Sequence, residues 1–185
     1  MNEGLRKFSE IDKVKYKIGP FVFSMLLAAH ISSHAEEKSH LTLCAASETV
    51  LFNCELQHKS ASLCFDEKIK LIKYRFGTRV KENLIYPKTP AKNEYSFKLS
   101  TTPYPGGGEN RIRFANGIYN YFIYDITRSQ QDKTSIDSIQ TAGIAVYENG
   151  KRIANLKCEN SETSIYPLAF EILQREEFSH DINTD

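Results

Sequence analysis

Residues 143–158 read Gly143-Ile-Ala-Val-Tyr-Glu-Asn-Gly150-Lys-Arg-Ile-Ala-Asn-Leu-Lys-Cys158, which is the pattern of one β-hairpin. Asn149-Gly150 separates two apolar-rich segments, and Asn-Gly is a strong hairpin signal because a type I′ turn needs two residues that tolerate positive φ. The second segment ends in a cysteine, far in the sequence from the other cysteines. The stretch therefore predicts a β-domain with a cross-link at its edge rather than an α/β enzyme.

Upstream of this hairpin, short strand-like segments follow one another between Gly, Pro, Asn and Asp residues. They cover 49–56, 60–65, 70–76, 82–86, 95–100, 111–114 and 119–124. In the segment 111–114, apolar residues alternate with Arg111 and Arg113, which predicts one buried face and one solvated face. Together with residues 143–158, these segments predict a mainly β fold, an antiparallel β-barrel or closed β-sandwich of about eight or nine strands.

Three segments depart from the strand pattern. Residues 126–141 are polar and predict a long loop. Between 163 and 174, apolar residues recur on one stripe, which predicts a C-terminal helix at about 164–175. From Glu176 onward the tail is polar, and we expect it to be frayed and disordered.

The N-terminal region, residues 1–35, resembles an export signal. Basic residues precede an apolar run from Ile18 to Ile31, and Ser33-His34-Ala35 offers small residues for cleavage before Glu36. The run is short for a membrane span, which needs about 20 residues. An uncleaved anchor remains the alternative. We expect one mature domain, 36–185, with its core at 49–158, which is periplasmic or secreted and has no membrane attachment after cleavage.

The four cysteines, Cys44, Cys54, Cys64 and Cys158, all lie beyond the expected cleavage point. An even number in an exported domain favours two disulfides, and the spacing matches no zinc site. The residues leave the pairing open. Cys54 and Cys64 could face each other across a hairpin, or Cys54 could pair with Cys158 and Cys44 with Cys64.

No grouped set of catalytic side chains stands out, so we expect a non-enzymatic protein without a metal or cofactor. The histidines expected after cleavage, His40, His58 and His180, form no metal-binding pair, and Asp66-Glu67 follows a strand as a solvated turn would. The formal net charge of +1 gives no field for nucleic acid. The basic residues of the strands are therefore expected to lie on a wet sheet face.

The glycine run Gly106, Gly107 and Gly108 follows Tyr104-Pro105. A phosphate-binding loop would need a helix and a Lys-Ser/Thr pair after it, whereas strand-like residues follow here. The run predicts a flexible or tightly bent loop. Such a loop can enter another protein's cleft, because a bare backbone approaches a partner closely.

Three pieces of the chain resemble the C-type lysozyme inhibitor family, which comprises small periplasmic or lipid-anchored bacterial β-barrel proteins. They are Leu51-Phe-Asn-Cys54, Arg113-Phe-Ala-Asn-Gly-Ile-Tyr119 and the ending at 145–158. The resemblance implies that Cys54 and Cys158 close the barrel. Where the family carries a Ser-Gly that enters the lysozyme cleft, this chain has Asn110 and Arg111. Tyr74-Arg-Phe-Gly77 and residues 106–108 also resemble small exported bacterial proteins without an assigned activity.

These observations lead us to expect an inhibitor or immunity protein that occludes the active site of a lysozyme-like hydrolase or a secreted toxin. The expected contact is the loop 102–110 with the neighbouring arginines; its residues are Tyr104, Gly106, Gly107, Gly108, Asn110, Arg111 and Arg113. The basic side chains would meet carboxylates of the enzyme. The alternative is a carrier whose inward-facing Phe and Tyr side chains surround a lipid-like ligand. The sequence does not indicate the oligomeric state.

Overall fold

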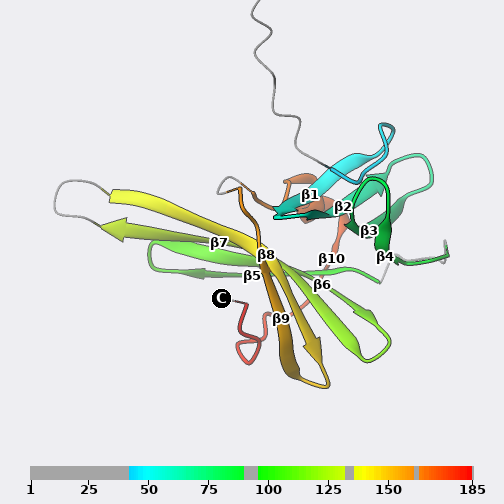
Figure 1. Ribbon diagram of the computed structural model, residues 1–185. Helices are drawn as coiled ribbons and strands as arrows, with labels where there is room; N and C mark the ends of the chain where they lie inside the picture. The colour runs from blue at the N-terminus through cyan, green and yellow to red at the C-terminus, as the bar shows by residue number, and fades with distance from the viewer. Residues whose placement is uncertain (1–41, 90–95, 132–135, 161–162, 185) are drawn as a thin grey trace, which may run out of the picture. The chain divides into compact units, whose positions relative to one another are not determined.

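The computed structural model describes residues 42–89, 96–131, 136–160 and 163–184. The expected export signal, residues 1–35, lies outside these ranges. Within them, no helix is long and apolar enough to cross a membrane. The described part is mainly β, with ten strands in two sheets and one short helix (Figure 1).

The smaller sheet is an antiparallel meander of four strands in chain order. Its strands are β1 (Thr49–Leu56), β2 (Lys59–Asp66), β3 (Leu71–Gly77) and β4 (Glu82–Tyr86). The buried positions of β3 alternate as its sequence predicts, with Ile72 and Tyr74 inside.

The larger sheet has six strands in the order β10-β5-β6-β7-β8-β9. The consecutive neighbours from β5 to β9 are antiparallel, and β10 adds a two-residue parallel pairing to β5. The bounds are β5 (Lys98–Tyr104), β6 (Gly107–Asn116), β7 (Tyr119–Gln131), β8 (Ile136–Glu148), β9 (Lys151–Lys157) and β10 (Gln174–Arg175).

The two sheets share one hydrophobic core and form a sandwich of open sheets, not a closed barrel. At its centre Phe114 stacks on Tyr121 with ring centroids 4.6 Å apart, and Tyr74 and Tyr86 lie 4.9 Å and 4.8 Å from Phe114. Such pairs stabilise a core beyond the area they bury. The inward-facing rings that a carrier would use to surround a ligand thus contact one another.

Two disulfides join distant parts of this sandwich. Cys44 bonds to Cys64 on β2, and Cys54 on β1 bonds to Cys158 just after β9. The second disulfide links the first strand of the small sheet to the end of the large one. This is the pairing that the family resemblance implies, and disulfides of this kind form in oxidising compartments.

Residues 132–135 lie outside the described part, and the rest of the segment 126–141 forms strands instead of the long loop that its polarity predicts. β7 continues to Gln131 and β8 begins at Ile136, and the two strands pair residue by residue from Ile126↔Thr141 to Gln131↔Ile136. A polar composition does not prevent strand formation in a hairpin whose sides are both solvated. Pairing with an established neighbour overrides weak local propensity.

The C-terminal helix is shorter than predicted. It is α1 (Leu168–Ile172), and Pro167 precedes it as the N-cap. The residues before it are not helical, and the N–H of Ile165 donates to Asp125 while the N–H of Tyr166 donates to the carbonyl of Leu51. The residues after it form β10, so tertiary hydrogen bonds end the helix at both sides.

Candidate functional site

The expected contact loop 102–110 is mostly a paired hairpin. Tyr104 ends β5, and Gly107 and Gly108 begin β6. The register runs from Thr102↔Glu109 to Tyr104↔Gly107, which leaves a two-residue turn at 105–106. Deep insertion into a cleft by a nine-residue flexible loop is therefore not available to this segment.

The glycines of this hairpin serve close packing against β7. Gly106 has a φ of +78°, and its carbonyl accepts hydrogen bonds from the Ser129 N–H at 2.6 Å and the Ser129 hydroxyl at 2.8 Å. A Cβ on Gly107 would lie 1.8 Å from the carbonyl oxygen of Thr127. Glycine is thus required where the backbones of β6 and β7 approach each other.

Asn110 belongs to the side of the large sheet that faces the core. Its amide donates to Asp125 Oδ1 at 2.7 Å, and Asp125 Oδ2 accepts the Ile165 N–H at 2.7 Å. Burial raises the pKa of the Asp125 carboxyl, and the hydrogen bonds from Ile165 and Asn110 offset only part of that effect. Asn110 therefore helps to hold the segment before α1.

Arg111 and Arg113 are occupied by the C-terminal tail. Arg111 Nε donates to Glu109 at 2.6 Å, its terminal nitrogen donates to the Ser179 carbonyl at 2.8 Å, and its guanidinium lies 4.0 Å from the centroid of the Phe178 ring. Arg113 binds both carboxylate oxygens of Glu176. Both arginines thus have acidic partners within the chain; Arg111 is buried, and the side chain of Arg113 is 30% exposed.

The tail crosses the outer face of the large sheet instead of fraying. The hydroxyl of Thr184 donates to Glu109, and the carbonyl of Asn183 accepts from Tyr147 at 2.7 Å. A second apolar cluster lies under the tail, on residues of β7 and β8, and the side chain of Ile182 in the tail packs against it. Its buried members are Phe122, Tyr124, Ile126, Ala145 and Tyr147.

One signal in the sequence could have revealed this covered face. The segment 121–124 is apolar at every position, whereas a strand with one wet face alternates. The continuous run indicates a strand that is buried on both sides. Arg111, on the neighbouring strand, is accordingly only 5% exposed.

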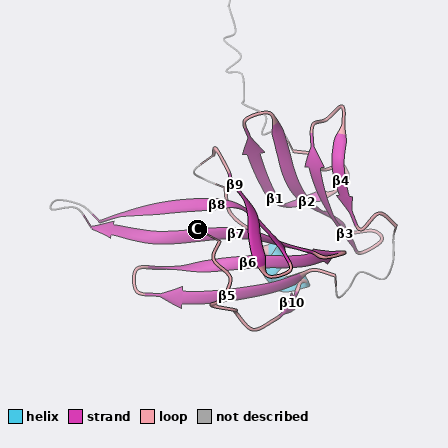
Figure 2. Cartoon of the chain, turned by 60° about the horizontal axis from the view of Figure 1, so that its bottom comes forward, coloured by secondary structure: helices cyan, strands magenta, loops and turns pink. Residues whose placement is uncertain are grey.

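The side chains most available to a partner lie at one end of the small sheet. The β1–β2 turn and the β3–β4 turn come together there, and Figure 2 shows both at the top of that sheet. We call residues 57–59 and 78–81 the small-sheet tip. The two turns flank a groove of about 360 Å³. Val80, at the apex of the second turn, is 98% exposed.

Hydrogen bonds fix the β3–β4 turn of the small-sheet tip. The N–H of Thr78 donates to the Lys81 carbonyl at 2.9 Å, and the N–H of Lys81 donates to the Thr78 hydroxyl at 3.0 Å. Gly77 has a φ of +146°, and a Cβ there would lie 2.4 Å from the Lys81 carbonyl oxygen. The sequence thus dictates a rigid turn that holds Val80 away from the sheet.

The charges at the small-sheet tip are mainly positive. Arg79 and Lys81 flank Val80, and Lys59 belongs to the other turn. In the described part of the chain, no ion pair joins Arg79 or Lys81 to an acidic side chain. Lys59 packs its ammonium 5.1 Å from the centroid of the Phe76 ring. The tip therefore combines one exposed apolar side chain with three cations, and Glu55 and Glu159 also line the adjoining groove.

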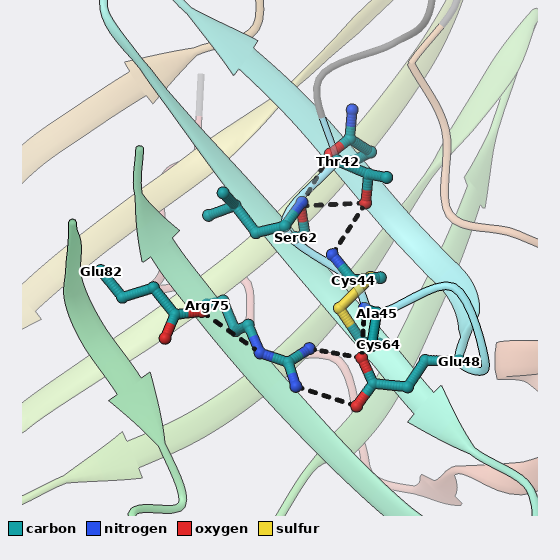
Figure 3. A network of polar contacts seen from close by, with 10 residues as sticks. Thr42, Cys44, Ala45, Glu48, Ser62, Cys64, Arg75 and Glu82 are labelled. Atoms are coloured by element: carbon teal, nitrogen blue, oxygen red, sulfur yellow. Dashed lines mark hydrogen bonds and ion pairs between the residues drawn. A yellow bond between two sulfur atoms is a disulfide. The ribbon is translucent and has the colours of Figure 1, made fainter. Parts of the chain in front are cut away.

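A polar cluster joins strands of the small sheet to the segment before β1 (Figure 3). Glu48 binds Arg75 through both oxygens, at 2.6 Å and 2.8 Å, and accepts the Ala45 N–H. Burial alone would raise the pKa of Glu48, but the hydrogen bonds from Arg75 and Ala45 outweigh it and lower the pKa. Glu48 lies near the sulfurs of Cys44 and Cys64. Those sulfurs form a disulfide, so they offer no thiolate to a metal.

No family model, curated protein or solved structure matches this chain. The resemblance to the C-type lysozyme inhibitors therefore stays a prediction.

Proposed function

We propose that this protein is an exported inhibitor or immunity protein, a non-enzymatic domain that occludes the active-site cleft of a secreted enzyme. The partner would be a lysozyme-like hydrolase that attacks the cell wall, or a toxin. The proposal keeps the partner class expected from the sequence and moves the contact from residues 102–113 to the small-sheet tip. The periplasm or the extracellular space would be its location.

The observation that carries the proposal is Val80, held 98% exposed at the apex of a hydrogen-bonded turn between Arg79 and Lys81. Single exposed apolar side chains are common, but an exposed apolar side chain at the apex of a rigid turn is less common. A turn that already has its bound conformation loses little conformational entropy on association. The preformed turn therefore favours insertion of Val80 into a cleft of the partner.

The charges of the tip support the same partner class. A hydrolase that cleaves glycosidic bonds uses a pair of carboxylic side chains in its cleft. Lys59, Arg79 and Lys81 of the small-sheet tip would steer association with such a cleft and pair with its carboxylates. Val80 would then fill an apolar subsite while the neighbouring cations exclude the substrate.

The experiment follows clearance of a peptidoglycan suspension by a C-type lysozyme in the presence of the exported chain. Val80→Asp is expected to weaken inhibition about 100-fold, since a central contact residue contributes about 2–4 kcal/mol. Ile69→Asp is the matched control. Ile69 is 61% exposed and lies in the β2–β3 turn at the opposite end of the same sheet.

Equal inhibition by the two variants would exclude the small-sheet tip as the contact. If the unaltered protein leaves lysozyme fully active at a molar excess, the lysozyme partner is excluded. The toxin version then requires that Val80→Asp abolish protection of cells against that toxin while Ile69→Asp preserves it.

A further inference from the structure

The hairpin of β7 and β8 extends past its neighbours in the large sheet (Figure 1). β9 first pairs with β8 at Gly143↔Lys157, and the N–H of Cys158 donates to the Ala142 carbonyl. Beyond Ala142, no strand of the described chain pairs with the outer edge of β8. Residues 137–141 therefore form an open strand edge.

The register shows which backbone groups this edge presents. Residues of an antiparallel strand direct their N–H and C=O groups alternately to one neighbour and the other. The Ala142 carbonyl points toward the β9 side, so Gln140 and Ser138 also point their N–H and C=O groups to that side. The edge thus offers donors and acceptors to an additional strand.

This edge has one charged side chain, Asp137 at its end, and otherwise lacks the devices that usually protect a strand from pairing. Protected edges carry lysine, proline or a bulge. Residues 136–142 contain neither lysine nor proline, and β7 and β8 pair without a register shift along their whole length. Ile139 in the middle of the edge is 47% exposed.

We infer that a second copy of this chain pairs antiparallel with residues 137–141 and joins two large sheets into one. A two-fold axis at Ile139 places Ser138 opposite Gln140 of the second copy, so their outward backbone groups meet. Ile139 then contacts Ile139 of the second copy, and Asp137 lies opposite Thr141. A register centred on Asp137 would oppose two carboxylates, which disfavours it.

The two-fold axis gives a closed dimer, because each copy contributes residues 137–141 and neither copy of this edge remains open. A strand pair of this length buries less surface than the roughly 1,000 Å² of a stable interface. The dimer is therefore expected to dissociate on dilution. It does not depend on the small-sheet tip, which lies on the other sheet.

The test is sedimentation velocity of the disulfide-intact exported chain over a roughly hundredfold range of concentration. The expected result is a concentration-dependent dimer. Ile139→Lys, which opposes two ammonium groups, is expected to keep the protein monomeric. Ile153→Lys is the matched control, because Ile153 is 51% exposed on β9, the end strand of the large sheet, and lies outside the proposed contact.

Gln140→Pro removes one outward N–H and is expected to abolish the dimer without loss of the β circular dichroism signal, since an outward position on an edge tolerates proline. A monomer at every concentration would overturn the inference. A dimer that survives Ile139→Lys, or one that Ile153→Lys dissociates, would overturn it as well.

Cross-linking tests the register directly. In the proposed pairing, Ile139→Cys places two sulfur-bearing residues in a non-hydrogen-bonded pair with Cα atoms about 4.5 Å apart, within reach of a disulfide. Thr141→Cys, two residues along the same face, is too far from its own equivalent. The covalent dimer is expected from the first variant only; equal amounts from both would contradict the register.

Discussion

Removal of the Cys54–Cys158 disulfide is expected to destabilise the protein more than removal of Cys44–Cys64. The first closes a loop of 104 residues and the second a loop of 20. A disulfide stabilises chiefly by restricting the unfolded chain, and the loop lengths give about 4.7 kcal/mol for the first and about 3.3 kcal/mol for the second. The expected difference in the free energy of unfolding is thus about 1.4 kcal/mol.

The two double variants, Cys54→Ala with Cys158→Ala and Cys44→Ala with Cys64→Ala, are well matched. Each removes one sulfur that is fully buried, on Cys54 or Cys64, and one that is partly exposed. The packing losses therefore nearly cancel in the comparison. Equilibrium unfolding in urea, followed by circular dichroism, gives both free energies. Equal losses, or a larger loss for the Cys44–Cys64 variant, would refute the loop-length argument.

Three further perturbations test the packing. Glu48→Gln should lower the free energy of unfolding by about 2 kcal/mol near neutral pH. Because the folded pKa of Glu48 is lowered, its carboxylate stabilises the fold above the unfolded pKa, and this stabilisation is lost as pH falls through the folded pKa. The stability difference between Glu48→Gln and the unaltered protein should therefore vanish in urea titrations at acid pH. Gly107→Ala should cost about 3 kcal/mol in urea titrations and Gly108→Ala much less, since only the former's Cβ overlaps the β7 backbone. Deletion of 176–184 should cost about 3 kcal/mol and raise binding of a hydrophobic dye; unchanged dye fluorescence would contradict a covered face.

The strands of this fold could be predicted from the sequence because their signals are local. Alternation and turn residues place β1 and β4 at the bounds that the structure shows. The Asn149-Gly150 turn is present with positive φ at both residues, as a two-residue hairpin requires. Such signals depend on neighbours within a few residues, which a single sequence displays.

The tail, the β7–β8 extension and the short helix could not be predicted, because distant partners determine them. Glu176 is 63 residues from Arg113, and Ile165 is 40 residues from Asp125. Local composition favours a frayed tail and a longer helix. The hydrogen bonds and ion pairs formed only in the assembled sandwich override that preference.

Distant partners also determine which glycines and arginines remain available for a candidate site, and residue types alone do not reveal this. Glycines and arginines are favoured at binding surfaces, but they are equally what a close strand approach and a buried carboxylate require. The sequence alone does not distinguish Arg113 from Arg79. In the structure Arg113 forms an ion pair with Glu176, whereas no acidic side chain of the described residues forms one with Arg79. A cation without an internal partner keeps its charge available, and the surface where such cations surround an exposed apolar side chain is the one suited to an external acidic partner.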